Sequence, residues 1–383
     1  RSMSSESVLD RTKALVPYLR EQARAAEQAR RLPDETFDAL AEAGILKMCA
    51  PKKYGGEQLP FEEQCDVLAE VGRGCPSSSW VATILSAMGW WLGTFSDEAQ
   101  DEVLGDGDPR ISGVVAPIGT LTPADGGFRL NGRWPFNTGG HGSRWAILGA
   151  LLDGVPHAIV VRSSDLKRLD DWYASGMAAT GSSTVVAEDV FIPTHRAQEM
   201  IGMMEGQYAT DRHTAGDPYY SLPLAAVLAI NAGGTPVGTA RGAMDAFMER
   251  LPGRAITYTD YTDQSAAPVT HINVAEAALT IDSADAHMRI AARILDRPAD
   301  GTVSFFERVK GRAHVTYLTG LSRQAVDILF FASGASSIQQ QVPIQRFQRD
   351  IQALANHAIM HAPTGNEIYG RVLCGLQPHT MII

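Results

Sequence analysis

Cysteine and long apolar runs are both scarce in this sequence, and each shortage excludes a class of protein. The four cysteines, at positions 49, 65, 75 and 374 of 383, match no zinc or redox spacing, and a chain this long needs no disulfide staples. We therefore expect reduced thiols and a cytoplasmic location. No apolar run approaches the roughly 20 residues that cross a bilayer, and the first residues lack the apolar core of a signal peptide, so we expect no membrane partner.

Positive charge is also in deficit. The 43 acidic residues outnumber the 33 basic ones, and the net charge of −10 argues against nucleic acid as a partner. No glycine-rich βαβ fingerprint of a nicotinamide dinucleotide site is present. What the chain does have is 45% hydrophobic and 20% charged residues, which is typical of a globular protein with about two to three domains.

The expected secondary structure changes twice along the chain. Apolar residues recur at helical spacing over residues 1–108, short β-rich runs fill residues 109–212, and the helical period returns over residues 213–383. Within the middle part, Asp125-Gly126, Asn131-Gly132 and Asp153-Gly154 are typical of hairpin turns. We predict a mainly α protein with an N-terminal helical domain, a middle antiparallel β-barrel or sandwich, and a C-terminal four-helix bundle.

Two short motifs in the middle part are candidates for a ligand site. GRWPFNTGG, residues 132–140, places two aromatic residues, Trp134 and Phe136, before Thr138 and Gly139. Aromatic rings can form a wall for a planar ligand, and a hydroxyl and glycine amides can bind its polar edge, although alternating aromatics in a strand are more often core residues. The second motif, Thr180-Gly181-Ser182, is by itself only a turn signal.

A third motif is PIQRFQRDIQALANHAIMH, residues 343–361. Pro343 suits the first turn of a helix, and Ile344, Phe347, Ile351, Leu354 and Ala358 give it an apolar face, so we predict one helix over this whole range. His357 then lies two turns after Asp350 on the same side. His357 and His361 have no evident third ligand, and we expect no metal site.

The α–β–α order, the two loops, the RD of the third motif and the segment LPDETFDALAEAGILKMCAPKKYGG, residues 32–56, together resemble the acyl-CoA dehydrogenase superfamily. The loops and the tail EIYGRVLCGLQPHT, residues 367–380, are most similar to its two-component flavin-dependent monooxygenases (group D), such as the oxygenase component of p-hydroxyphenylacetate 3-hydroxylase. The resemblance covers nearly the whole chain.

This resemblance implies a function and its partners. The expected reaction is hydroxylation of a small aromatic substrate of the phenolic, polyketide or indole type, by O₂ and a reduced flavin through a flavin hydroperoxide. FADH₂ and FMNH₂ both remain open as the cofactor. A separate NAD(P)H:flavin reductase is implied, because the chain has no nicotinamide fingerprint of its own. The resemblance also implies a homotetramer that assembles through the C-terminal bundles.

The resemblance further implies roles for individual residues. Those expected to bind the flavin are Trp134, Phe136, Thr138, Gly139, Thr180, Gly181, Ser182 and Arg254. Arg254 would reach a flavin phosphate, often in a neighbouring subunit, and the alternative for it is a solvated arginine at a helix end. The catalytic candidates are His357 as a base, Ser182, and His141, for which a surface loop position is equally open.

Three other functions are alternatives to this one. An acyl-CoA dehydrogenase needs a carboxylate base, but its usual position holds Ala358 and residues 221–244 contain no Asp or Glu. An N- or S-oxygenase of the same fold would depend less on His357, and a non-catalytic scaffold would bind no reduced flavin. Two positions that are histidines in several aromatic hydroxylases are Met88 and Gly142 here, so the substrate pocket is expected to differ from theirs.

Overall fold

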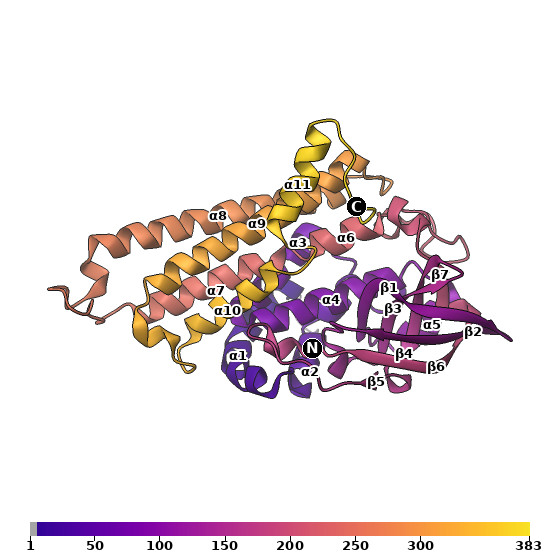
Figure 1. The fold of residues 1–383 in the computed structure, drawn as a ribbon, viewed down its shortest axis with the longest axis horizontal. Helices are drawn as coiled ribbons and strands as arrows, with labels where there is room; N and C mark the ends of the chain where they lie inside the picture. Colours follow the sequence, from indigo (N-terminus) through magenta and orange to yellow (C-terminus); the bar gives the residue numbers. More distant parts are fainter. Residues whose placement is uncertain (1–5) are drawn as a thin grey trace.

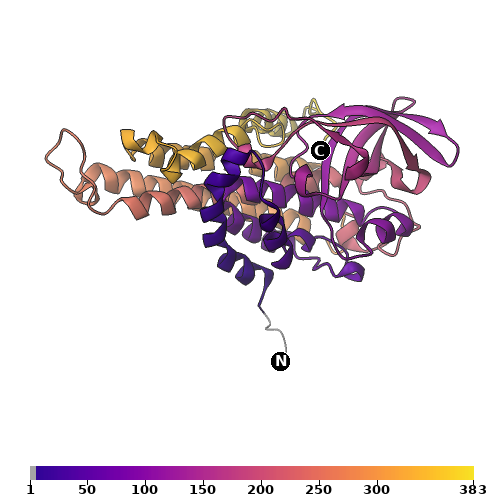
Figure 2. The same ribbon diagram turned by 90° about the horizontal axis from the view of Figure 1, so that it is seen from below.

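The computed structural model describes residues 6–383 and shows a helical part, a β-sheet and a second helical part in that order (Figure 1). The bundle extends to one side and the sheet lies at the other, with the first helices packed between them (Figure 2). The N-terminal helices are α1 (Val8–Ala29), α2 (Asp34–Glu42), α3 (Phe61–Gly74), α4 (Pro76–Leu92) and α5 (Asp97–Leu104).

Local sequence signals explain where α1 and α9 (Phe305–Phe331) begin, since each starts with a capping box. The Ser7 hydroxyl accepts the Asp10 N–H at 3.1 Å, and the Asp10 carboxylate accepts the Ser7 N–H in return. Ser304 and Glu307 form the same reciprocal pair at the start of α9. Each box satisfies two backbone donors that a helix N-terminus would otherwise leave without partners.

The middle part is one seven-stranded sheet with the order β5-β6-β2-β1-β3-β4-β7. The prediction of a purely antiparallel arrangement was wrong for one pair, since β1 and β3 run parallel while the other neighbours are antiparallel. The strands are β1 (Ile111–Ala124), β2 (Gly127–Trp134), β3 (Trp145–Leu152), β4 (Val155–Arg162), β5 (Lys167–Arg168), β6 (Val185–Pro193) and β7 (Ala197–Glu199).

The parallel pair follows from the path of the segment that we call the first loop, residues 135–144. Strand β2 ends at Trp134, at the edge of the sheet where β1 begins, and β3 starts there too, with Trp145 opposite Ile111. The first loop therefore passes from one side of β1 to the other at the same edge. A chain that crosses over in this way must continue parallel to the strand it has crossed.

Two of the three predicted hairpins are present. Asp125-Gly126 joins β1 to β2, and Asp153-Gly154 joins β3 to β4 with φ values of 49° and 80°, the positive values that such tight turns require. The prediction at Asn131-Gly132 was wrong, because these residues lie inside β2 at a register shift. A Cβ on Gly132 would lie 2.7 Å from the Trp134 ring, so the glycine makes room for that indole.

The C-terminal part contains the predicted four-helix bundle, in which α7, α8, α9 and α10 pack side by side (Figure 1). Threonine, glycine and alanine residues are frequent on the buried faces of α7 and α9, which lets the helices approach closely. The helices are α6 (Leu224–Asn231), α7 (Gly234–Arg250), α8 (Pro268–Asp296), α9 (Phe305–Phe331), α10 (Pro343–Ala355) and α11 (Ala362–Leu373).

The helix predicted over residues 343–361 is shorter than expected. Helix α10 ends at Ala355, and His357 lies in the turn that follows rather than on the helix. The His357 N–H donates to the Leu354 carbonyl at 3.0 Å. This acceptor is three residues back and not four, so the chain forms a tighter turn than an α-helix. Pro363 has no N–H with which to continue the helix, and it instead occupies the first turn of α11.

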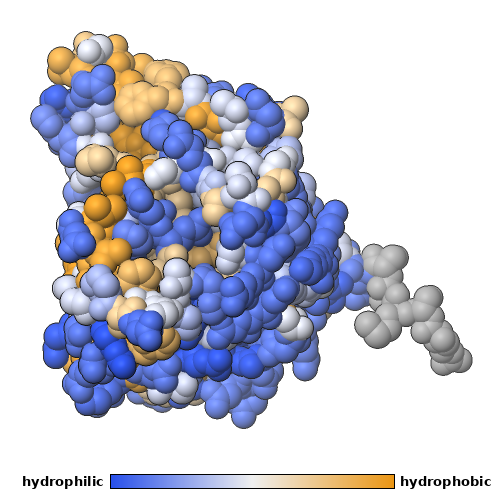
Figure 3. Space-filling model, turned by 90° about the vertical axis from the view of Figure 1, so that its right-hand side faces the viewer, coloured by the Kyte–Doolittle hydropathy of each residue, from blue (hydrophilic) through white to orange (hydrophobic). Residues whose placement is uncertain are grey.

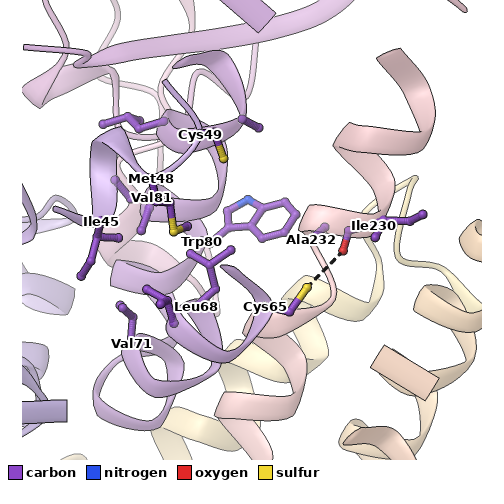
Figure 4. Close-up of a cluster of buried hydrophobic side chains, with 14 of the residues drawn as sticks. Ile45, Met48, Cys49, Cys65, Leu68, Val71, Trp80, Val81, Ile230 and Ala232 are labelled. Atoms are coloured by element: carbon purple, nitrogen blue, oxygen red, sulfur yellow. Dashed lines mark hydrogen bonds between the residues drawn. The ribbon is translucent and has the colours of Figure 1, made fainter. Parts of the chain in front are cut away.

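Two large apolar cores hold these parts together, and a third, small cluster consists of Val309, Ile368 and Ile383. The larger lies among the helices and contains Trp80, and there the Cys65 thiol donates to the Ile230 carbonyl at 3.7 Å (Figure 4). Burial raises the pKa of the Cys65 thiol, so this cysteine stays protonated and acts as a core residue. The smaller core lies within the sheet.

The surface is mostly hydrophilic on the β-sheet side of the molecule, with apolar side chains gathered toward one edge of that face (Figure 3). Among the described residues, no helix is both long enough and apolar enough to span a bilayer.

Candidate active site

The two aromatic residues of the first motif lie in different surroundings. Trp134 ends β2, is fully buried in the sheet core, and donates its Nε1–H to the Gly149 carbonyl at 2.8 Å. Phe136 has a φ of 62° and leaves 66% of its surface exposed. Its ring meets the Trp172 ring edge-on, with 6.1 Å between centroids. Phe136 is therefore the aromatic side chain that this loop offers to a ligand.

The first loop is joined to a second loop, residues 169–184, by backbone hydrogen bonds. The Asn137 N–H donates to the Ser183 carbonyl at 3.2 Å, and the Gly139 N–H donates to the Thr180 carbonyl at 3.0 Å. Gly139 and Gly181 have φ values of 68° and 57°, which a residue with a Cβ rarely adopts. The structure thus brings together the two motifs, which are about forty positions apart in the chain.

Three buried hydroxyls form a chain between the loops. Thr138 Oγ1 lies 2.7 Å from Ser182 Oγ, and Ser182 Oγ lies 2.6 Å from Thr180 Oγ1. Thr180 donates its proton to the Met177 carbonyl at 2.8 Å. Because each hydroxyl has a single proton, Ser182 must donate to Thr180 and Thr138 must donate to Ser182. The Thr138 oxygen keeps free lone pairs, so this end of the chain is an acceptor for an incoming N–H.

The second loop is also anchored to the bundle. Asp350 of α10 is buried, and its carboxyl accepts the Met177 N–H at 2.7 Å. Burial raises the pKa of Asp350 to about 7, against its ordinary value of 3.8. Because Met177 in turn accepts the Thr180 hydroxyl, α10 helps to hold the end of the hydroxyl chain in place.

His357 packs against an aromatic residue of α4. Its ring meets the Trp80 ring edge-on at 5.2 Å between centroids, and burial lowers the pKa of His357. The Ile359 N–H donates to Nδ1 of His357 at 3.2 Å. A neutral imidazole has one N–H, so with Nδ1 accepting, the proton is on Nε2. His357 therefore offers a hydrogen-bond donor at Nε2.

Comparison with known proteins then shows the family. The N-terminal domain model of acyl-CoA dehydrogenases matches residues 11–104, and the C-terminal domain model matches residues 230–362. The chain is 33% identical to the flavin-dependent monooxygenase oxygenase subunit HsaA of Rhodococcus jostii (strain RHA1), over 96% of this chain and 98% of that protein. The chain belongs to the acyl-CoA dehydrogenase family, in its branch of flavin-dependent monooxygenase oxygenase components.

Other relatives of this oxygenase agree. The oxygenase component of the FADH(2)-dependent resorcinol hydroxylase of Rhizobium sp. (strain MTP-10005) is 30% identical over 97% of this chain and 95% of that protein. The crystal structure of 3-HSA hydroxylase from Rhodococcus sp. RHA1 has a TM-score of 0.89 at 31% identity and covers 99% of both chains. XiaF from Streptomyces sp., in complex with FADH2 and glycerol, has a TM-score of 0.89 at 32% identity, over 97% of this chain and 96% of XiaF.

The residues of the oxygenase fit a reduced flavin. Phe136 presents an exposed aromatic face, and the Thr138 oxygen is an acceptor at the buried end of the site. A reduced isoalloxazine needs both an apolar surface and a partner for its N–H groups. Gly139 and Gly181 serve the packing of the loops, because a Cβ on Gly139 would lie 2.9 Å from Val81 and one on Gly181 would lie 2.7 Å from His141. Trp134 takes no part in this set, because its indole is enclosed in the sheet core.

Two predicted site residues lie apart from this group. His141 is in a hollow beside the end of α1, where its Nε2 lies 3.5 Å from Ser183 Oγ, and it does not pair with His357. Arg254 lies in the connection from α7 to α8, at the end of the bundle away from the sheet (Figure 1), where its Nη2 donates to the Ser333 carbonyl at 2.6 Å. Within one chain, neither side chain is brought to the hydroxyls.

Three further positions lie around the site. The two residues of RD make separate contacts, since Arg349 pairs with Glu27 of α1 at 2.6 Å while Asp350 binds the second loop. Trp172, which sequence reasoning missed, packs on Phe136, and its position directly after Asp170-Asp171 of the second loop gives no signal of this contact. Met88 is buried against Gly113, so an apolar contact fills the position where related hydroxylases have a histidine.

Proposed function

We propose that this oxygenase hydroxylates a small aromatic substrate of the phenolic, polyketide or indole type, using O₂ and a reduced flavin made by a separate NAD(P)H:flavin reductase. The observation that carries this proposal is the kind of hydrogen-bonding groups present. They are the hydroxyl chain of the two joined loops and the Nε2–H of His357, and none of them is a carboxylate. FADH₂ is the cofactor to test first, because XiaF is known with FADH2, and FMNH₂ is the alternative. A cytoplasmic location, where NAD(P)H is available, is part of the proposal.

The bound cofactor would supply the two electrons with which O₂ is split, one oxygen atom going to the substrate and the other to water. The chain itself would hold the ring on Phe136 and accept one of its N–H groups at Thr138. The fixed direction of the hydroxyl chain means that Ser182 has no proton left to give. We therefore assign Ser182 to orienting Thr138, not to proton transfer.

His357 is better suited to donate a hydrogen bond than to act as the base predicted from the sequence. Its Nδ1 lone pair is taken by the Ile359 N–H, and its Nε2 carries the proton. To accept a substrate proton it would have to lose the Ile359 bond and become charged in a buried site, which burial opposes. As a donor, Nε2–H would polarise a phenolate oxygen or an oxygen atom in transfer.

Dehydrogenation of an acyl-CoA lacks a suitable base in this site. The carboxyl on α10 nearest to the two loops is that of Asp350, and it is buried and bonded to the Met177 N–H. A base for an α-proton must have a free lone pair within hydrogen-bond reach of the substrate. Ala358, at the position of the usual base, has no titratable group.

A homotetramer is the second part of the proposal. Val269, Ile272 and Leu279 of α8 are each more than half exposed, an arrangement that a helix in a monomer would not favour. Arg254 lies at the same end of the bundle, remote from the loops of its own chain. Packing of bundles between subunits would cover the apolar face of α8 and would let Arg254 reach the flavin phosphate of a neighbour.

The activity is tested with purified protein, an NAD(P)H:flavin reductase, FAD or FMN, and a panel of phenols, resorcinols and indoles under isotopically labelled O₂. We expect one labelled oxygen atom in the product, and a loss of product in His357→Ala but not in His379→Ala, an exposed histidine outside the site. Failure to oxidise any aromatic substrate, together with reduction of bound oxidised flavin by an acyl-CoA, would overturn the assignment.

The tetramer is tested separately by light scattering after size-exclusion chromatography. We expect the wild-type mass to be that of four chains and Leu279→Glu to reduce it, because a carboxylate would then be buried in the interface. Glu276→Gln, an exposed change one turn away on the same helix, should leave the mass unchanged. A monomeric wild-type protein would contradict this part of the proposal without affecting the chemistry.

A further inference from the structure

A small hollow outside the flavin-facing side of the loops concentrates positive charge. We call it the arginine pocket. It has a volume of about 240 Å³ and lies between the C-terminal end of α1, strand β5 and the two loops. It is lined by Ala29, Arg30, Arg31, His141, Arg168, Leu169, Asp170 and Ser183. Three arginines and one aspartate give its wall a formal charge of +2, in a chain whose net charge is −10.

The three arginines are not equally neutralised. Arg30 pairs with Asp170 at 2.8 Å and lies over the Tyr173 ring, and Arg31 pairs with Asp34 at the rim. Among the described residues, Arg168 has no carboxylate within salt-bridge distance. Its one side-chain hydrogen bond is from Nη1 to Asn137 Oδ1 at 3.3 Å. A half-buried guanidinium with most of its five donors free is an uncommon arrangement, because leaving it without an anion is costly.

Besides burial, the positive charge of the arginines lowers the pKa of His141. Burial and then the charges of Arg168, Arg31 and Arg30 lower the pKa of His141 to about 4, so the imidazole is neutral at physiological pH. The pKa of Arg168 is also lowered, by burial and by Arg31. Like charges are thus held together in the hollow, and in the part of the chain that the structure describes no carboxylate pairs with Arg168, since Asp170 pairs with Arg30.

We propose that the arginine pocket binds a small oxyanion of the phosphate type. The guanidinium fork of Arg168 matches the paired oxygens of such an anion, Arg31 and Arg30 add charge, and a neutral His141 and the Ser183 hydroxyl add neutral hydrogen bonds. A volume of about 240 Å³ holds one phosphate with several waters, since a water occupies roughly 30 Å³. This proposal stands independently of the aromatic substrate.

The pocket is mechanically connected to the first loop. Asn137, which accepts the Arg168 N–H, stands between Phe136 and Thr138. Gly140 makes this contact possible, because a Cβ there would lie 1.9 Å from Asn137 Oδ1 and 2.5 Å from Arg168 Nη1. An anion that draws Arg168 toward itself would also pull on Asn137. Asn137 lies between Phe136, which faces the flavin, and Thr138 of the hydroxyl chain. Occupancy of the pocket is thereby coupled to the position of the first loop.

The binding test uses the full-length oxygenase without flavin and inorganic phosphate as the probe. We expect phosphate to raise the unfolding temperature of the wild type relative to sodium chloride at the same ionic strength, and to raise it equally in Arg24→Gln. Arg24 is an exposed arginine on the same helix that does not line the pocket. In Arg168→Gln the phosphate-dependent increase should be lost. An equal increase in Arg168→Gln, or an equal effect of chloride, would overturn the proposal.

A second readout covers the case in which Arg168→Gln does not fold. In protein with isotopically labelled histidine, phosphate should raise the pKa of His141 above about 4, because an anion offsets the arginine charges. A His141 resonance that does not respond to phosphate would count against binding. The source of the anion is separated by comparing FMN with riboflavin. If only FMN raises the unfolding temperature through Arg168, and inorganic phosphate does not, the pocket holds a cofactor phosphate and the proposal of a free oxyanion fails.

Discussion

Asp350→Asn should make the oxygenase more stable at alkaline pH while keeping the bond to the second loop. The asparagine oxygen can still accept the Met177 N–H, but it cannot ionise. In the wild type, burial raises the pKa of Asp350 to about 7 from an ordinary 3.8. Between these values the folded state holds a proton that the unfolded state has released, so stability falls as pH rises through this window.

The size of the effect follows from the same values. Each pKa unit corresponds to about 1.4 kcal/mol, so the full cost of ionising Asp350 in the folded protein is about 4 kcal/mol above pH 7. About 1.5 kcal/mol of that cost is already present at pH 5, because the unfolded carboxyl is ionised there. The advantage of Asp350→Asn over the wild type should therefore grow by about 3 kcal/mol between pH 5 and pH 8.

The measurement is urea unfolding of both proteins at several pH values and at one fixed protein concentration. Asp327→Asn is the matched control, since this aspartate of α9 is only partly buried and its carboxylate accepts a hydrogen bond from Gln352 at 3.0 Å. We expect its stability difference from the wild type to change less between pH 5 and pH 8 than that of Asp350→Asn. An Asp350→Asn advantage that stays constant from pH 5 to pH 8, or a variant less stable than the wild type at pH 8, would refute the reasoning.

The remaining predictions concern the loops and the turn. His357→Gln should keep more product formation than His357→Ala, which should lose about 10²-fold or more, because glutamine retains an N–H donor; equal losses would favour a proton-accepting role. Phe136→Ala should weaken reduced-flavin binding with little change in stability, whereas Trp134→Phe should cost about 1–3 kcal/mol of stability by leaving the Gly149 carbonyl unpaired, with little change in flavin affinity. Ser182→Ala should cost a similar amount and slow hydroxylation, since it leaves Thr138 without its acceptor; binding titrations and unfolding curves distinguish these cases.

The order of helices and strands could be predicted from the sequence because it depends on local patterns. Apolar residues three and four apart indicated the bundle helices, and Asp125-Gly126 and Asp153-Gly154 have the backbone freedom that tight hairpins need. The same kind of signal failed at Asn131-Gly132. There the glycine is required by the Trp134 ring packed above it and not by a turn.

The parts of the site that could not be predicted depend on contacts between distant residues. Trp134 and Phe136 would point to the same side if the strand continued, and only the positive φ of Phe136 turns its ring to the surface. The bond between Asp350 and Met177 joins positions 173 residues apart. The tautomer of His357 depends on α10 ending at Ala355, since the Ile359 N–H would otherwise be used within the helix.

The path of the first loop across the start of β1 limits how the enzyme can be re-engineered. Because this segment is both the flavin-contacting surface and the connection that sets β3 beside β1, a change in its length would alter the register of the sheet together with the site. Insertions, tags or new chain ends would be better tolerated at the Asp153-Gly154 hairpin, where the strands on both sides are already aligned. Libraries that aim at new substrates should therefore vary side chains in the first loop and keep its residue count fixed.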